Sequence, residues 1–190
     1  MTTRLFLAPS RLSLLAALAA GLLALAACKS ESKSEPKPEL VVQVPASLTA
    51  AKSEIETTLR SYEALRALLA DDRIEPAAGP AGELAAAAAG AAQKAPANLR
   101  EPLEKLGQRA VQLKEASKGD AAAARKAFGD VSQALVALLR AEPALRQGLN
   151  VFECPMAQGY KQWVQPGDKL ENPYMGKSML DCGAPGKWDA

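Results

Sequence analysis

The stretch Ile55-Glu-Thr-Thr-Leu59-Arg-Ser-Tyr62-Glu-Ala-Leu65-Arg-Ala-Leu-Leu69 has a regular helical pattern. Its large apolar side chains recur at intervals of three and four residues, and charged side chains such as Glu56, Arg60 and Glu63 lie between them. This spacing places the apolar side chains on one face of an α-helix and the charged ones on the other. We therefore predict a helix from about residue 48 to residue 70 that buries one face in a core.

Three later segments also have helical character. Residues 83–95 consist mostly of alanine, the best helix former, and they follow a break that contains Gly79 and Pro80. Residues 99–118 carry leucines on one face, and Asp120 is a natural N-cap for a fourth helix that ends near Pro143. Four helices with short links predict an all-α fold, a four-helix up-and-down bundle. Because alanine buries little apolar area, we expect its core to be thin.

The N-terminus predicts export and a lipid anchor. Two arginines precede an apolar stretch from Leu14 to Ala27, which is typical of a secretory signal peptide and too short to span a membrane. The stretch leads into Leu25-Ala26-Ala27-Cys28, which matches the bacterial lipobox, so we predict a signal peptide of residues 1–27 and lipidation of Cys28. Residues 28–46 alternate charges with prolines and predict a flexible tether. Residues 47–190 are then the folded domain.

The expected location is the cell envelope, with the protein attached to a membrane through its lipid. Lys29 after the lipid site favours the outer membrane, facing the periplasm. The chain has 23 Lys and Arg against 21 Asp and Glu, and loss of the signal peptide leaves 21 of each. Nucleic-acid binding requires a basic face that neutralises phosphates, so this charge balance argues against nucleic acid as a partner.

Histidine is absent from the whole chain. This residue is the commonest general base and the commonest metal ligand, and it belongs to the usual catalytic triads. We therefore expect that the protein is not an enzyme and has no catalytic residues.

The chemistry of the chain is concentrated in its C-terminal tail, residues 152–184. There the helical periodicity ends and aromatic residues, proline and glycine become frequent, so we expect an irregular tail packed on the bundle. Five sulfur-bearing side chains lie in it: Cys154, Met156, Met175, Met179 and Cys182. The last three are four and three residues apart, which would place their sulfurs on one face if that segment were helical.

These sulfurs leave two alternatives open. Thiolates and thioethers are soft ligands that favour Cu(I), so the five side chains are candidate ligands of a soft metal, with Cu(I) as the cofactor. Alternatively, Cys154 and Cys182 form a disulfide, as paired cysteines of exported proteins usually do, and the methionines fill gaps in the packing. That disulfide would close a loop of about 29 residues and contribute about 3.6 kcal/mol to stability.

The tail motif also resembles a known family. Cys154-Pro155-Met156-Ala157, then Trp163, then Asn172-Pro173-Tyr174-x-Gly176-x-x-Met179-x-x-Cys182-Gly183 is similar to the end signature of bacterial periplasmic domains of unknown function. Those domains occur alone or fused to the adaptor subunits of copper, silver and other heavy-metal efflux pumps. The resemblance implies a helical bundle closed by the Cys/Met tail and a role in heavy-metal resistance, and it does not decide between ligands and a disulfide.

The beginning of the tail resembles a second feature of these adaptors. Phe152-Glu-Cys154-Pro155-Met156 is similar to their short heavy-metal-binding motif, which continues with His-Pro. In this chain Ala157-Gln158 stands at that place. A histidine-containing metal site is therefore excluded, and sulfur and backbone atoms remain as donors.

The sequence thus predicts a lipid-anchored protein whose tail binds a soft metal as an accessory to a heavy-metal efflux system. The rival interpretation is a non-enzymatic interaction module of the envelope. In that module a Cys154–Cys182 disulfide holds the tail, and the tail aromatics form a docking surface for an envelope partner. The state of the two thiols distinguishes these interpretations.

Overall fold

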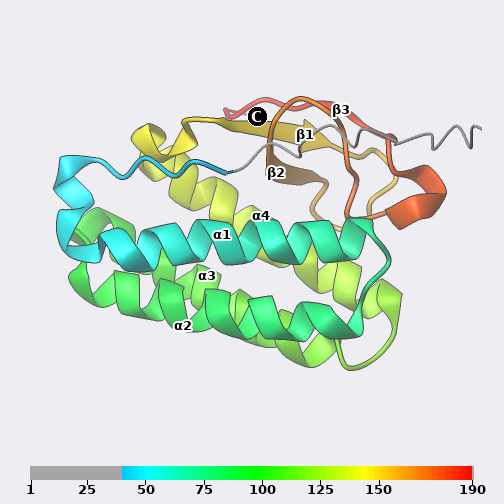
Figure 1. Cartoon of the computed structure of the whole chain (residues 1–190), viewed down its shortest axis with the longest axis horizontal. Coiled ribbons are helices and arrows are strands. Elements are labelled where there is room, and N and C mark those ends of the chain that lie inside the picture. The colour runs from blue at the N-terminus through cyan, green and yellow to red at the C-terminus, as the bar shows by residue number, and fades with distance from the viewer. Residues whose placement is uncertain (1–39, 190) are drawn as a thin grey trace, which may run out of the picture. The chain divides into compact units, whose positions relative to one another are not determined.

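The computed structural model of the chain describes residues 40–189 (Figure 1). The predicted signal peptide, Cys28 and most of the tether lie outside this range. Within it, none of the helices combines the length and the hydropathy that a membrane-spanning helix needs. Leu40, Val42 and Val44, which the sequence analysis assigns to the tether, pack half-buried against the core, so the folded domain includes them.

Four α-helices make up most of the domain: α1 (Lys52–Ala70), α2 (Ala78–Lys94), α3 (Ala97–Ala116) and α4 (Ala121–Ala141). Each packs against the next one in the chain, as Figure 1 shows. Short 3₁₀ turns flank them: η1 (Ala46–Ala51), η2 (Glu75–Ala77) and η3 (Pro143–Arg146). The four predicted helices are therefore confirmed, with small differences at their ends.

The largest difference in a helix boundary is at the start of α2. Gly79 and Pro80 are predicted to belong to a break before this helix, whereas the helix already begins at Ala78. Proline is tolerated there because the N–H groups of a first helical turn have no partner within the helix. The predicted N-cap of α4 is confirmed, since the Asp120 carboxylate accepts the N–H of Ala123 at 2.8 Å.

The tail is more regular than predicted. Strands β1 (Leu149–Glu153), β2 (Gln162–Pro166) and β3 (Ala184–Pro185) form an antiparallel sheet in the order β2-β1-β3. A further 3₁₀ turn, η4 (Gly176–Met179), precedes β3. The tail packs on the helices as expected and is irregular between these short elements, but the domain is mostly helical with a small sheet rather than all-α.

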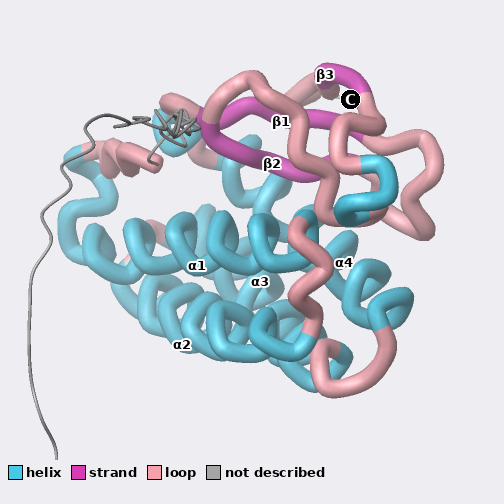
Figure 2. Tube along the Cα trace, turned by 45° about the vertical axis from the view of Figure 1, so that its right-hand side comes forward, coloured by secondary structure: helices cyan, strands magenta, loops and turns pink. Residues whose placement is uncertain are grey.

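The sheet lies on the side of the helices formed by α1 and α4 (Figure 2). Strand β2 packs against α4 and also contacts α1, and all five of its residues are buried. The first and last helices are thus linked through the tail. The tail is therefore an integral layer of the fold.

A chain of aromatic rings joins the helices to this layer. Tyr62 of α1 stacks on Phe128 of α4 with ring centroids 5.5 Å apart, and Phe128 meets Tyr174 edge to face at 5.6 Å. Tyr174 in turn contacts Trp163 at 5.9 Å, and Trp163 stacks on Phe152 at 5.6 Å. Such pairs add to the free energy of burial. One continuous core therefore runs from the helices into the sheet.

The alanine-rich helix packs closely, as expected for small side chains. Ala81, Ala88 and Ala91 of α2 have no exposed surface. A Cβ on Gly107 of α3 would lie 3.2 Å from the carbonyl oxygen of Ala85. Helices α2 and α3 therefore approach each other more closely there than a larger side chain would allow.

Candidate functional site

The C-terminal tail folds around one buried asparagine. Asn172 has no exposed surface, and its side-chain oxygen accepts the N–H of Tyr174 at 2.8 Å and that of Met175 at 3.2 Å. Its side-chain amide donates to the carbonyl oxygen of Cys182, and its main-chain N–H donates to that of Leu180 at 2.7 Å. Asn172 therefore fixes the two backbone segments that carry Met175 and Cys182.

A buried arginine ties this part of the tail to α1. Arg66 is 1% exposed, and two of its guanidinium nitrogens donate to the carboxylate of Glu63 at 2.7 and 2.8 Å. The guanidinium also donates to Glu171, at 2.7 Å to the main-chain oxygen and at 3.0 Å to the carboxylate. Burial acts to lower the pKa of Arg66, but the two carboxylates outweigh it and raise that pKa. The charged arginine therefore holds the residue directly before Asn172.

A second arginine, Arg125 of α4, holds the following segment. It donates to the carbonyl oxygen of Pro173 at 3.2 Å and pairs with the carboxylate of Asp72. The other oxygen of that carboxylate accepts the N–H of Lys177 at 3.0 Å. Gly176, at φ +61°, lies beside the Asp72–Arg125 pair, and a Cβ on Gly176 would collide with the Asp72 carboxylate. A side chain at position 176 would therefore disrupt the attachment of the tail.

The two tail cysteines lie next to each other, and no disulfide joins them in this structure. Cys154 follows β1 and is fully buried, and its N–H donates to the carbonyl oxygen of Lys161 at 3.0 Å. Cys182 is half-buried. Partial burial raises the pKa of the Cys182 thiol, and the adjacent Cys154 side chain, which hydrogen-bonds with it, raises that pKa further. The structure thus brings together the two thiols that the sequence assigned to one site.

The methionines are not arranged as predicted. Helical structure in this segment is limited to the single turn η4, so Met175, Met179 and Cys182 do not share a helical face. Met175 and Met156 instead line one surface hollow of about 440 Å³ together with Tyr174, and Met156 is 54% exposed. Met179 is half-buried at the end of η4, and its carbonyl oxygen accepts the N–H of Cys182 at 3.1 Å.

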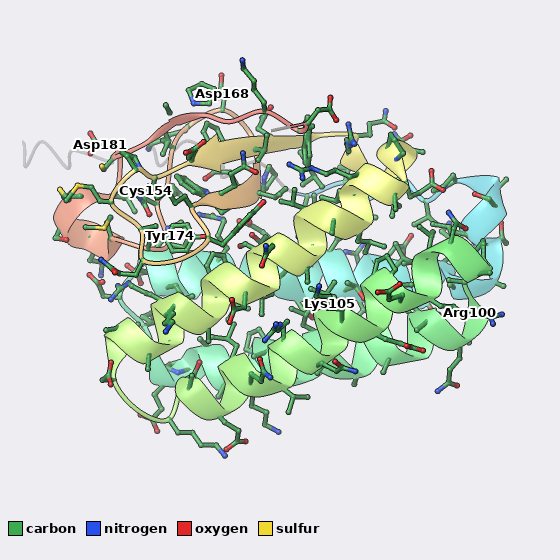
Figure 3. All side chains as sticks on the ribbon, turned by 180° about the vertical axis from the view of Figure 1, so that it is seen from behind. Arg100, Lys105, Cys154, Asp168, Tyr174 and Asp181 are labelled. Carbon is green, nitrogen blue, oxygen red and sulfur yellow. The ribbon has the colours of Figure 1, made fainter. Side chains whose placement is uncertain are left out.

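All sulfur atoms in residues 40–189 belong to these five side chains. Figure 3 shows the sulfur atoms at the end of the domain where Cys154 and Tyr174 are labelled. The side chains therefore gather in one region but form two pairs, with Met179 in neither. One group is the adjacent pair of thiols, and the other is the pair of thioethers at the hollow.

The other motif residues of the tail serve its packing. Trp163 is fully buried, and its indole N–H donates to a glutamine of the same strand at 2.9 Å. Tyr174 and Pro173 are buried, whereas Pro155 is exposed on the turn after β1. A Cβ on Gly183, at φ +148°, would lie 3.0 Å from the Trp163 ring. Trp163, Tyr174, Pro173 and Gly183 therefore pack the part of the tail that carries the sulfur side chains.

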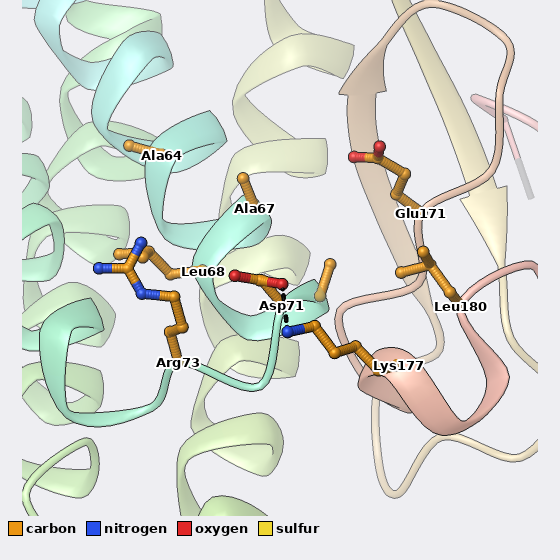
Figure 4. Close-up of a pocket in the computed structure, with 9 residues that line it drawn as sticks. Ala64, Ala67, Leu68, Asp71, Arg73, Glu171, Lys177 and Leu180 are labelled. Atoms are coloured by element: carbon orange, nitrogen blue, oxygen red, sulfur yellow. Dashed lines mark ion pairs between the residues drawn. The ribbon is translucent and has the colours of Figure 1, made fainter. Parts of the chain in front are cut away.

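A second hollow, of about 510 Å³, lies between the C-terminal end of α1 and η4 (Figure 4). Alongside alanines and leucines it is lined by Asp71, Arg73, Glu171 and Lys177, and Asp71 pairs with Lys177 at 2.7 Å. No sulfur belongs to the described side chains that line this hollow. It is therefore separate from the sulfur groups.

In the described part of the chain, His, Cys, Asp and Glu side chains form no group of three or more that could hold a metal. Hard divalent ions and zinc depend on such groups.

Arg66, Arg125 and Asp72, which attach the tail to the helices, are not among the site residues predicted from the sequence. Arg66 and Arg125 look like ordinary charged residues of amphipathic helices, and their partners in the tail are far away in sequence. Asp72, which follows Asp71 at the end of α1, has φ +59°. Aspartate is among the few residues that tolerate this conformation, so the Asp-Asp pair was a signal for a turn.

No protein-family model, no curated protein and no solved structure matches the chain. A functional proposal therefore depends on the side chains of the tail.

Proposed function

We propose that the protein binds a soft metal ion, Cu(I), through the thiolates of Cys154 and Cys182. It does so as a lipid-anchored accessory to heavy-metal efflux or resistance in the cell envelope. The observation that carries this proposal is the pair of adjacent cysteine side chains on two separately fixed backbone segments. Thiolate is the donor that most strongly selects Cu(I) over harder ions.

The surroundings of the thiols support such a site. Cys154 is fixed by its position after β1, and the amide of Asn172 fixes the main chain at Cys182. The geometry of the pair therefore exists before the ion arrives, which lowers the cost of ordering the ligands. Because Cys182 is half-buried while Cys154 is fully buried, the ion would enter from the side of Cys182.

The adjacency of the thiols also favours the rival function. In an oxidising compartment two neighbouring thiols form a disulfide, and the protein would then be an interaction module with a stapled tail. A metal and a disulfide exclude each other, since only the thiolate is a ligand. The redox state of the isolated protein therefore decides between the two functions.

The direct test is a Cu(I) titration of the reduced mature protein against a chromophoric Cu(I) chelator. We expect about one tightly bound Cu(I) per chain at the thiols, and none at the thiols after oxidation. A thiol count on the air-exposed protein provides the control. If no thiol is found in air and the reduced protein takes no Cu(I) from the chelator, the metal function is wrong and the disulfide module is supported.

The affinity for Cu(I) should increase with pH. The raised pKa of Cys182 means that its thiol is protonated at neutral pH, and this proton must leave when the metal binds. Each proton released on binding gives about a tenfold gain in affinity per pH unit, and the share that comes from Cys182 ends once the pH exceeds its pKa. The measurement is the chelator competition between pH 6 and pH 9. An affinity that stays constant over this range would remove Cys182 from the ligand set.

A further inference from the structure

The hollow at Met156 and Met175 is built from three separate segments. The loop between β1 and β2 contributes Met156, Ala157 and Gln158, the first turns of α4 contribute Ala121, Ala122, Arg125 and Lys126, and Tyr174 and Met175 close it. The two cysteines are not part of its lining. Two methionines that are 19 residues apart in sequence therefore line one surface hollow without the cysteines.

The chemistry of the lining is selective. Thioethers are neutral and soft, and no carboxylate lines the hollow among the described residues, so hard cations find no suitable donor. Arg125 is already engaged by the Asp72 carboxylate and the main-chain oxygens of Leu69 and Pro173. The exposed Lys126 is therefore the positive charge at the rim that an incoming group meets.

The size of the hollow leaves room for more than a bare ion. A volume of about 440 Å³ lies in the range of pockets that hold small molecules, roughly 300–1,000 Å³. A group that carries the ion therefore has room beside the thioethers. The ammonium of Lys126 favours an anionic carrier over a free cation.

We infer that this hollow is a second soft-metal site, which receives Cu(I) from an anionic carrier through the thioethers of Met156 and Met175. The inference rests on the proposed Cu(I) function but uses different sulfurs. The step is a ligand exchange: a bond from copper to thioether sulfur forms as a bond from copper to the carrier breaks, and the oxidation state does not change. Tyr174 lines the hollow and lies close to Cys154, so the two sulfur groups are neighbours.

The test uses the mature protein with its methionine methyl groups labelled with ¹³C and its thiols oxidised to the disulfide. Ag(I), which is soft and redox-inert, is the probe. We expect the methyl resonances of Met156 and Met175 to shift together while that of Met179 stays unchanged. Met156→Leu or Met175→Leu should weaken Ag(I) binding at least tenfold, and Met179→Leu is the matched control without effect. These exchanges conserve volume and keep the fold.

The opposite results are equally defined. A Met179 methyl group that shifts with the others, or shifts that occur only in reduced protein, would show a single mixed site and overturn the inference. If reduced protein binds no Cu(I) at its thiols while the thioether shifts persist, the proposed thiol site fails and the hollow remains. If the thioether resonances do not shift while the thiols still bind Cu(I), the methionine site is wrong and the proposed thiol site stands.

The anionic carrier is tested separately with Lys126→Gln. This change should weaken uptake of silver from its anionic thiosulfate complex several-fold and should not weaken binding of free Ag(I). Lys126 contributes no ligand, so the methyl shifts at saturation should be those of the wild type. If uptake from the thiosulfate complex is unchanged, the carrier does not depend on this charge, and that part of the inference is wrong.

Discussion

Replacement of Arg66 by methionine is expected to destabilise the protein by about 3 kcal/mol, which lowers Tm by roughly 6–12 °C. Methionine retains an unbranched apolar stem but removes the guanidinium. The Glu63 and Glu171 carboxylates and the main-chain oxygen of residue 171 then lose the hydrogen bonds that Arg66 donates to them. Removal of one partner of a buried ion pair is costly because the other charges stay behind. The Glu63 and Glu171 side chains are 14% and 26% exposed. We therefore place the loss of stability at the lower end of the range of about 3–5 kcal/mol for a broken buried ion pair.

Arg109→Met is the matched control. Arg109 of α3 pairs with Asp130 at 4.0 Å, and these side chains are 37% and 46% exposed. An exposed pair of this kind contributes about 0.5 kcal/mol or less. Thermal unfolding followed by circular dichroism compares the two variants. If both lower Tm by the same small amount, Arg66 does not hold the tail, and the attachment depends on the aromatic core instead.

The helices were predictable because each has a strong local signal. Ile55, Leu59, Tyr62, Leu65 and Leu69 follow the helical period, and all are buried as that period predicts. A periodic apolar face contains the information about both the helix and its orientation toward the core. The prediction of four helices therefore needed no knowledge of the tertiary contacts.

The strands were missed because their signals are mixed. Strand β2 is Gln162-Trp-Val-Gln-Pro166, in which apolar and polar residues do not alternate, and it is buried along its whole length. Its glutamines are paired inside the protein: Gln165, for example, accepts the indole N–H of Trp163. Gly148 and Gly159, at φ +74° and +83°, mark the turns on either side of β1. Together with Val151 and Phe152 they could have predicted a hairpin.

The candidate site was predictable in its atoms but not in its arrangement. The soft donors of the tail follow directly from residue types, and the adjacency of Cys154 and Cys182 agrees with their assignment to one site. The separation of Met156 and Met175 from the thiols depends on how the loop after β1 folds over α4. That contact is between segments far apart in the chain, and no local pattern encodes it.

Replacement of Cys154 or of Cys182 by serine should weaken Cu(I) binding at the thiol site by at least about 100-fold. A serine hydroxyl is a hard neutral donor for Cu(I). Mutation of a residue that only hydrogen-bonds to a metal ligand already lowers metal affinity about 10–100-fold, and loss of the soft ligand itself should cost more. The measurement is the chelator competition in reduced protein. Position 154 is fully buried, so a serine there buries a hydroxyl group. If that hydroxyl finds no hydrogen-bond partner, the protein loses about 1–3 kcal/mol of stability. Cys182→Ser, at a half-buried position, therefore provides the cleaner loss of binding without loss of fold.

The same variants distinguish the disulfide from the metal site when stability is measured in both redox states. A structural disulfide predicts that oxidised wild-type protein is more stable than Cys182→Ser by about 3.6 kcal/mol, and that the difference largely disappears on reduction. A metal site predicts the reverse dependence: Cu(I) raises the Tm of reduced wild-type protein by mass action and leaves that of Cys182→Ser unchanged. If Cu(I) stabilises both proteins equally, the thiols are not its ligands. If the wild-type protein is stabilised only by oxidation, Cys154 and Cys182 form a structural disulfide that holds the tail against the helices.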